Sequence, residues 1–399
     1  MANVRERSPG HWEIRAYAGT DPATGRKRWR WATYTASRKE PGSGRRSAEK
    51  AQRALQAAAD AERPGSEMSV GAFLGLWLED REPRVSPTTI DGYRTKARLV
   101  ASGPLASVRL CDLGPRDVES WYRVLRESGK TAANVRSAHQ VLSAALRVAV
   151  RWGWLDRSPM DRVDVAPRTT ERPVAPTMRE VRQLVEAADA GRDPGLAEIV
   201  VFAVLTGMRR GEICGLRFSD VTRFPGEPPM TVATVSRSVW QAGGRWGVKE
   251  PKSRAGRRRV TLDAMAERAV ELRAERLRER AAVAGTPVPD DAYVFAPGLS
   301  GDPLMPDTVT QAWSRLTKRQ ERETGRPWPF RFHDLRHASA TEMVGAGVDV
   351  ATVAGRLGHA DPSVTLRVYA HVLATRDAEA AGVLGRALGP GRDDAPDQR

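Results

Sequence analysis

Histidine and arginine are concentrated in the segment FRFHDLRHASAT, which runs from Phe330 to Thr341. The chain of 399 residues has six histidines, and four of them lie between positions 333 and 371. Residues three apart on a helix share a face, so His333 and Arg336 would project together. Such a concentration of a scarce residue type indicates a chemical site.

Other groups suited to the same chemistry lie outside this segment. Arg209 follows Gly207 in TGMRRGE, at an expected loop-to-helix transition, and Lys252 lies in a predicted turn, EPKSRAGRRRV. His359 ends an apolar helical pattern, and Tyr369 follows ten residues later. Two arginines, two histidines, a lysine and a tyrosine can hold a phosphodiester and stabilise its pentacoordinate transition state. They also provide a nucleophile and a leaving-group acid.

A zinc site is the main alternative for the histidine pair. His333 and His337 are four residues apart, which matches two ligands on one helix face. No third ligand follows at a usual spacing, no HExxH pattern is present, and Arg336 between the histidines would repel a dication. We therefore expect no metal and no cofactor.

The lysine assignment leaves two alternatives open. Lys252 precedes a run of arginines at 254, 257, 258 and 259, so it could be one more phosphate-contacting charge within a basic segment. Lys249 is a second candidate, but it precedes Pro251 and lies outside the turn motif. We favour Lys252.

Composition indicates the partner and the compartment. A formal net charge of +15 favours a polyanion, because each neutralised phosphate releases counterions. The longest apolar run, IVVFAVL, is far shorter than the roughly 20 residues that cross a bilayer. The first residues lack the apolar stretch of a signal peptide. We expect a cytoplasmic, nucleoid-associated protein with no membrane contact.

The pattern of elements predicts a multidomain, mainly α fold. Residues 1–64 read as a small module with two strands, a turn and a helix that starts at Ser47. Its tryptophans either form the core or enter a DNA groove, and both roles are compatible. Residues 68–165 predict a four-helix domain, with a proline-rich linker over 157–177. Residues 175–385 predict a mostly helical domain with a small antiparallel sheet, and 386–399 a disordered tail.

Five motifs occur in the order found in the tyrosine recombinases, the family of phage and transposon integrases. They are TGMRRGE (206–212), PKSRAGRRRV (251–260), HDLR (333–336), LGH (357–359) and YAH (369–371). The match is specific over residues 178–380. The helical region resembles the core-binding, SAM-like domain of that family, and residues 1–64 resemble its arm-binding module.

The resemblance implies a role for each matching residue. Tyr369 would attack the scissile phosphate and form a 3′-phosphotyrosyl link, while Arg209 and Arg336 hold the non-bridging oxygens. Lys252 would protonate the 5′ oxygen, His333 would assist proton transfer, and His359 would hydrogen-bond the phosphate. Glu212 would orient Arg209. His337 and His371 match flanking positions and are not assigned a catalytic role.

The resemblance therefore implies a site-specific recombinase that integrates or excises a phage or mobile element. It also implies double-stranded DNA attachment sites, a synaptic tetramer on DNA, and an excisionase or host DNA-bending protein as possible partners. Type IB topoisomerases share this chemistry without site choice, and a non-catalytic DNA-binding regulator could share the fold. A metal phosphodiesterase would need clustered carboxylates, whereas these motifs are cationic.

Overall fold

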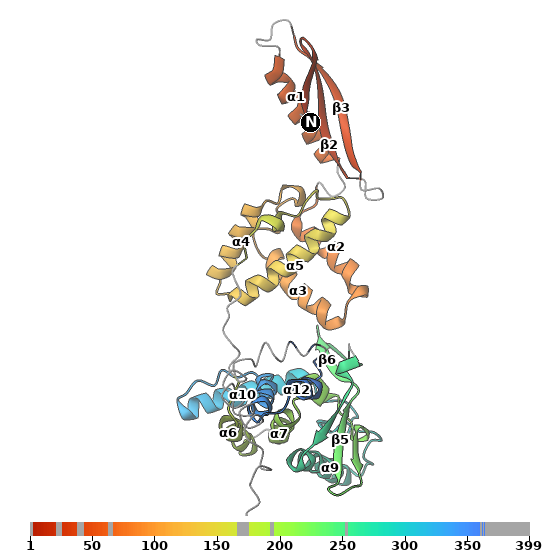
Figure 1. Cartoon of the computed structure of the whole chain (residues 1–399), viewed down its shortest axis with the longest axis vertical. Helices are drawn as coiled ribbons and strands as arrows, with labels where there is room; N and C mark the ends of the chain where they lie inside the picture. The colour runs from red at the N-terminus through yellow and green to blue at the C-terminus, as the bar shows by residue number, and fades with distance from the viewer. Residues whose placement is uncertain are drawn as a thin grey trace, which may run out of the picture. The chain divides into compact units, whose positions relative to one another are not determined.

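The computed structural model describes residues 3–20, 26–37, 44–62, 67–165, 175–191, 195–251, 254–359, 361 and 363. The chain divides into two units, Met1–Thr170 and Glu171–Arg399. Figure 1 shows their elements, and each unit is considered by itself below.

The first part of the N-terminal unit is a three-stranded antiparallel sheet, β1–β2–β3, with one helix against it. The elements are β1 (Val4–Ser8), β2 (His11–Thr20), β3 (Lys27–Thr35) and α1 (Arg45–Ala61). Two strands and the helix agree with the sequence prediction, but β1 was missed, because VRERS is polar and carries no apolar alternation. The helix begins at Arg45, two residues before its predicted start at Ser47.

The two faces of this sheet differ in the way that a period of two requires. Trp12 and Ile14 are buried with Ala48 of α1 in a small core. Arg15 points to the other face, where its guanidinium lies 4.4 Å from the ring centre of Trp29 and 5.7 Å from that of Trp31. Trp31 is 56% exposed. The tryptophans therefore divide between the core and an open basic face.

The rest of the unit contains the four predicted helices. They are α2 (Val70–Arg81), α3 (Pro87–Ala101), α4 (Pro115–Glu127) and α5 (Ala132–Arg151). Ser69 and Thr131 cap α2 and α5 with their side chains, and Ser86 precedes Pro87 at the start of α3. Fully buried aromatic side chains, Trp77, Trp121 and Tyr122 among them, fill the core. Met160 and Val163 join this core, so the first residues of the predicted linker belong to the helical unit.

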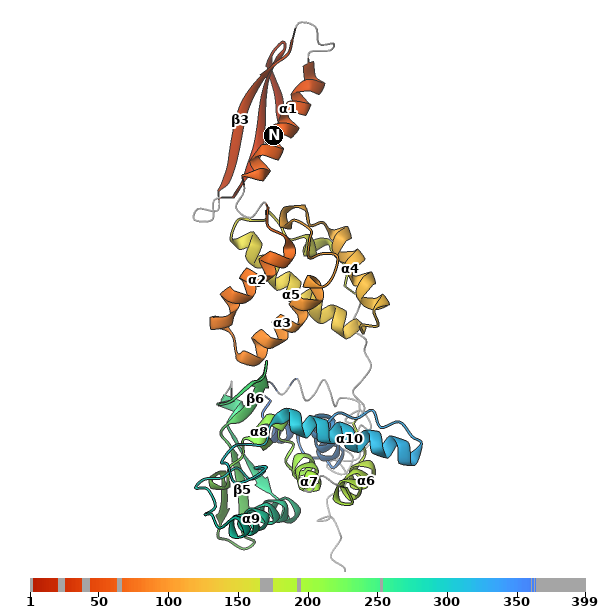
Figure 2. The same ribbon diagram turned by 180° about the vertical axis from the view of Figure 1, so that it is seen from behind.

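The C-terminal unit is mainly helical around one large apolar core. Its helices are α6 (Met178–Asp189), α7 (Leu196–Thr206), α8 (Arg210–Cys214), α9 (Ala264–Ala284), α10 (Pro306–Thr324), α11 (Asp334–Gly345) and α12 (Val350–Leu357). The long helix α10 contacts α6, α7 and α8, as the view in Figure 2 shows. The core thus fixes the helix ends that precede the site residues.

In the described residues of the C-terminal unit, two small antiparallel sheets are present where the sequence predicted one. One has the order β4–β5–β8, from β4 (Val221–Phe224), β5 (Met230–Val235) and β8 (Arg258–Leu262). The other is the hairpin of β6 (Ser238–Ala242) and β7 (Arg245–Lys249), which turns at Gly243 and Gly244 with φ of 56° and 74°.

The fold class is the predicted one, mainly helical with small antiparallel sheets. In the described part of the chain, no helix is both long enough and apolar enough to cross a membrane.

Candidate active site

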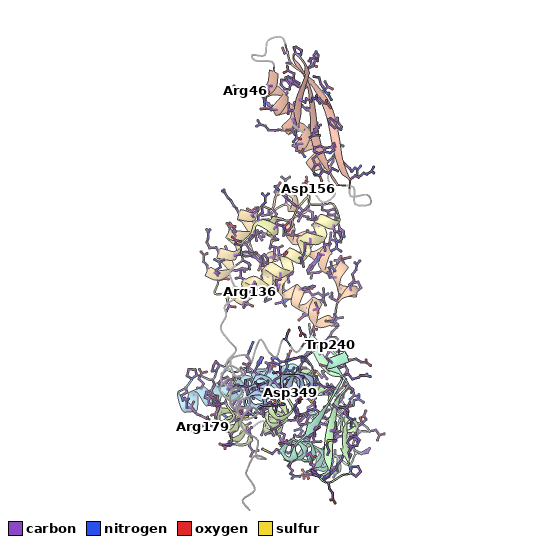
Figure 3. All side chains as sticks on the ribbon, viewed as in Figure 1. Arg46, Arg136, Asp156, Arg179, Trp240 and Asp349 are labelled. Atoms are coloured by element: carbon purple, nitrogen blue, oxygen red, sulfur yellow. The ribbon has the colours of Figure 1, made fainter. Side chains whose placement is uncertain are left out.

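Arg209 lies at the junction between two helices. Helix α7 ends at Gly207, whose φ of 63° is left-handed, and α8 begins directly after Arg209. A Cβ atom on Gly207 would lie 2.5 Å from Cδ2 of Leu357, so only glycine allows α12 to approach here. Helix α8 in turn packs against β6, the strand that carries Trp240 (Figure 3). These contacts fix the direction in which the chain leaves α7 and enters α8.

The guanidinium of Arg209 is held on one side and open on the other. Its Nη1 donates to Oε1 of Glu212 at 2.8 Å, and its Nη2 donates to the carbonyl oxygen of Gly358 at 3.1 Å. The side chain is still 41% exposed. Arg209 can therefore meet an anion in solution without losing its orientation.

Glu212 is the anchor for this arginine. Its side chain is only 5% exposed and also accepts a hydrogen bond from the backbone N–H of Arg209 at 2.9 Å. Burial alone would raise the pKa of this carboxyl group, but hydrogen bonds from Arg258 and from the Arg209 backbone outweigh it, so the pKa is lowered. Glu212 is thus a carboxylate at neutral pH.

The second arginine, Arg336, comes from the first turn of α11. It is 4% exposed, and its Nη1 donates to the carbonyl oxygen of Gly207 at 2.6 Å. This bond joins α11 to the residue that ends α7, two positions before Arg209. The two arginines that are distant in sequence therefore meet at one backbone turn.

The start of α11 is fixed by Asp334, which sequence reasoning did not single out. Asp334 is buried, and its carboxylate accepts bonds from the backbone N–H of Arg331 at 2.7 Å and from the Arg331 guanidinium at 3.0 Å. His333 is the N-cap residue of this helix and is exposed. Its ring lies edge-on to that of His337, with 5.5 Å between ring centres.

His359 follows the left-handed end of α12. Asp349 caps the start of this helix, and Gly358, with φ of 71°, ends it (Figure 3). The backbone N–H of His359 donates to the carbonyl oxygen of Ala354 at 3.0 Å, which closes the turn. The half-buried ring interacts electrostatically with Arg336 and Arg209.

Both candidate histidines are neutral near pH 7. Although the residue as a whole is exposed, loss of hydration around its ring, followed by the neighbouring His337 and Arg336, lowers the pKa of His333 to about 4. Loss of hydration, followed by Arg336 and Arg209, likewise lowers the pKa of His359 to about 4. Two neutral imidazoles and two guanidiniums thus share one site, which favours an anionic ligand.

Four of the six predicted catalytic residues lie in the described part of the chain, and the structure brings these four together. Lys252 and Tyr369, like His371, lie outside the described residues. Among the residues described, no group of three or more histidine, cysteine, aspartate and glutamate side chains could hold a metal ion. The described groups can bind a phosphate and move protons.

Arg258, one of the arginines in the basic run after Lys252, is not a surface charge. It is buried and bonded to Glu212. The alternation of Arg258, Val260 and Leu262 along β8 places all three on the buried face. The alternation is visible in RRVTL, but the sequence analysis considered this segment only as a run of basic residues.

Comparisons with known proteins identify the family of the chain. The phage integrase family matches residues 177–376. A tyrosine recombinase XerC-like protein of Caldanaerobacter subterraneus is 24% identical over 334 residues, which cover 80% of this chain and 83% of the relative. The ICEBs1 integrase of Bacillus subtilis is 23% identical over 385 residues, which cover 96% and 99%.

Solved structures show the same fold. A Tn1549 transposon integrase in complex with a circular intermediate DNA gives a TM-score of 0.66 at 21% identity, over 80% of this chain and 99% of that one. A lambda integrase tetramer bound to a Holliday junction gives 0.56 at 18% identity, over 92% and 94%. The fold and the motifs define a tyrosine-type site-specific DNA recombinase. The chain belongs to the phage integrase family.

Proposed function

We propose that this recombinase cleaves and rejoins double-stranded DNA attachment sites with Arg209, Lys252, His333, Arg336, His359 and Tyr369. The observation that carries the proposal is the meeting of Arg209 and Arg336 at the end of α7, through Gly207, with His359 beside both. Two fixed guanidiniums match the two non-bridging oxygens of a phosphodiester. The order of the six residues in the sequence matches the order of the family motifs.

In the cleavage step, the phenol oxygen of Tyr369 bonds to phosphorus and the bond to the 5′ oxygen breaks. The phenol proton passes to His333, and Lys252 gives a proton to the departing 5′ oxygen. Arg209 and Arg336 stabilise the extra negative charge of the pentacoordinate transition state. Rejoining reverses these steps with the 5′ hydroxyl group of another strand, so no external energy source is consumed.

The lowered pKa values of the histidines fit this scheme. Neutral His333 has a nitrogen that can accept the phenol proton, and neutral His359 can donate an N–H bond to phosphate. The negative charge of the bound phosphate would raise both pKa values again, because a nearby anion favours the imidazolium. The histidines would therefore become better bases when DNA enters.

The finer assignments are parts of the same proposal. Residues 1–64 would bind accessory DNA sites, 68–165 the core site, and 175–385 would carry the chemistry. The predicted tail, 386–399, lies outside the described residues. The lambda integrase forms a tetramer on a Holliday junction, and we propose a synaptic tetramer on DNA here. An excisionase or a host DNA-bending protein would set direction, and the protein would act in the cytoplasm on the nucleoid.

A covalent-trapping experiment tests the proposal. The DNA flanking the gene supplies the attachment sites, and a nick next to the scissile phosphate lets the cleaved fragment diffuse away. We expect an adduct of protein and DNA that survives denaturation, is removed by protease, and forms in excess EDTA. Binding without any adduct would indicate a regulator, and cleavage that EDTA abolishes would indicate a metal-dependent nuclease.

A further inference from the structure

The buried residue Arg258 contacts parts of the site that belong to different sequence motifs. It occupies the first position of β8, and its side chain is 6% exposed, whereas that of Arg257 is 61% exposed. A charge buried this deeply needs several partners to offset the loss of hydration. Its partners therefore show what it does.

The guanidinium of Arg258 makes hydrogen bonds in three directions. Nε donates to the carbonyl oxygen of Arg356 at 2.6 Å, Nη1 to that of Gly256 at 3.3 Å, and Nη2 to Oε2 of Glu212 at 2.9 Å. The first acceptor lies in the last turn of α12, where carbonyl groups lack helical partners and attract a cation. One side chain thus ties β8 to α12 and to α8.

These contacts form a closed ring around the phosphate-facing arginine. Arg258 bonds Glu212, Glu212 bonds Arg209, and Arg209 bonds the carbonyl oxygen of Gly358. The circuit returns to Arg258 by packing and not by a bond, since a Cβ atom on Gly358 would lie 2.9 Å from Nη1 of Arg258. His359 comes directly after this glycine. Movement of Arg258 would therefore release both Arg209 and the turn before His359.

Arg258 also sets the charge of the site. Glu212 lies between two arginines, so the three groups together carry one net positive charge. Without Arg258, the carboxylate would be matched by Arg209 alone, and the field that Arg209 presents to a phosphate would weaken. The surroundings of Glu212 would also change, because the bond from Arg258 opposes the effect of burial on its pKa.

We propose that Arg258 is a positioning residue for strand cleavage, which holds Glu212, and through it Arg209, against the turn of Gly358 and His359. This inference rests on the proposed function, because it assigns Arg209 to the scissile phosphate. All three guanidinium nitrogens of Arg258 already donate hydrogen bonds within the protein, so we assign it no contact with DNA. Its loss should slow the chemical step and leave DNA affinity nearly intact.

The first arm measures single-turnover cleavage of saturating nicked DNA by Arg258→Met. We expect a rate about 10–100-fold lower, the range seen when groups that orient metal ligands are removed, with affinity within a few-fold of normal. Arg273→Met is the matched control, because Arg273 is another buried arginine bonded to backbone carbonyl groups, those of Val294 and Ala296. It should lose stability and keep the cleavage rate. Equal loss of cleavage in both variants would overturn the proposal.

The second arm separates positioning from general destabilisation by the pH profile of cleavage. Glu212 is faced by Arg209 and Arg258, with His359 beside both arginines. In Arg258→Met the pKa of Glu212 rises, so cleavage should be lost at a higher pH on the acid side than in the wild type. Adding Glu212→Gln should remove that shift. Profiles parallel to the wild type would show a purely structural role.

The third arm tests whether Arg258 affects cleavage through Arg209 or through Lys252. DNA with sulfur at the bridging 5′ position has a leaving group that needs no proton. Sulfur should restore Lys252→Ala and leave Arg258→Met slow, because the proposed route runs through Arg209. Rescue of Arg258→Met would place its effect in the Lys252 turn and overturn this route. Absence of any adduct in the wild-type protein would instead contradict the proposed function.

Discussion

At the scale of single residues, substitution of Arg336 tests whether this buried side chain acts on the transition state or on DNA binding. A preorganised donor that acts on the transition state typically contributes about 10²–10³ in rate, whereas one phosphate contact among many contributes little to affinity. We expect Arg336→Ala to lose cleavage to that extent and to bind attachment-site DNA nearly normally. Single-turnover cleavage and gel-shift titration measure the two quantities.

Arg210→Ala is the control for Arg336→Ala. Arg210 neighbours Arg209, but its guanidinium faces Asp307 at 4.0 Å and not the site. This variant should cleave at close to the normal rate. A parallel loss of binding and cleavage in Arg336→Ala would show that Arg336 only positions the DNA.

The two active-site histidines make a prediction about stability and pH. Their pKa is about 4 in the folded protein and about 6.5 in an unfolded chain. Between these values the unfolded state binds more protons, so stability is complete above pH 6.5 and falls as the pH drops towards 4. His333→Gln should flatten this fall in unfolding temperature.

His11→Gln serves as the comparison for the pH series. His11 is exposed on β2, in the other unit of the chain. This variant therefore controls for the general effect of replacing a histidine. If the His333→Gln curve is parallel to the wild type, the ring of His333 is not held neutral by the fold.

At the scale of elements, the end of α12 depends on a glycine with no room for a side chain. A Cβ atom on Gly358 would lie 3.0 Å from the carbonyl oxygen of Ala255 and 2.9 Å from Nη1 of Arg258. Gly285 ends α9 with a similar φ of 63° and has open space around it. Both alanine variants should lose about 1–2 kcal/mol for the left-handed backbone.

Gly358→Ala should lose more stability than Gly285→Ala, and only Gly358→Ala should cleave slowly, because it displaces the turn before His359. Chemical denaturation and single-turnover cleavage measure the difference. Equal stability losses with normal cleavage in both variants would show that the contact with Arg258 is unimportant.

Sequence patterns predicted the helices better than the sheets. The apolar spacing of three and four, with caps such as Ser69 and Thr131, marks the helices of the N-terminal unit because packing and capping act locally. Strand β1 was missed because its residues are polar and mostly exposed, so its pairing with the neighbouring β2 leaves no apolar alternation in the sequence. Met160 and Val163 show the same limit, since proline-rich sequence hid a segment that packs in the core.

The residues of the site also differ in how well the sequence predicted them. Ordered motifs predicted Arg209, His333, Arg336 and His359, because each falls at a recognisable spacing. Arg258 was not assigned its supporting role, because that role arises from a tertiary contact. Asp334 was not assigned one either, although its bonds to Arg331 are local, because the histidines and arginines of HDLR were the residues assigned chemical roles. The bond between Arg258 and Glu212 spans 46 positions, and no local pattern contains it.

At the scale of the whole molecule, the N-terminal sheet and α1 have their own small core, separate from that of the helical elements that follow. A protein that begins at Met68 keeps the backbone bond from Leu110 to that residue. It should still cleave a core site, but recombine poorly on DNA that requires accessory sites. Recombination between complete attachment sites, with cleavage of a core site in parallel, measures the two activities.

A full-length variant, Trp31→Ala, refines this test. Trp31 is exposed on the open face of the sheet and packs on Arg15, so it should weaken accessory-site binding without loss of the module. Full recombination by the truncated protein would exclude a functional role for residues 1–64.

The central claim is that Tyr369 is the nucleophile of this recombinase. Tyr369→Phe removes the attacking oxygen and keeps the ring, so the variant should bind attachment-site DNA normally and form no covalent adduct on nicked DNA. In the wild-type adduct, mass spectrometry of the DNA-linked peptide should locate the phosphate on Tyr369. A phosphotyrosyl peptide from the phenylalanine variant, or one centred on another tyrosine in the wild-type protein, would contradict the account.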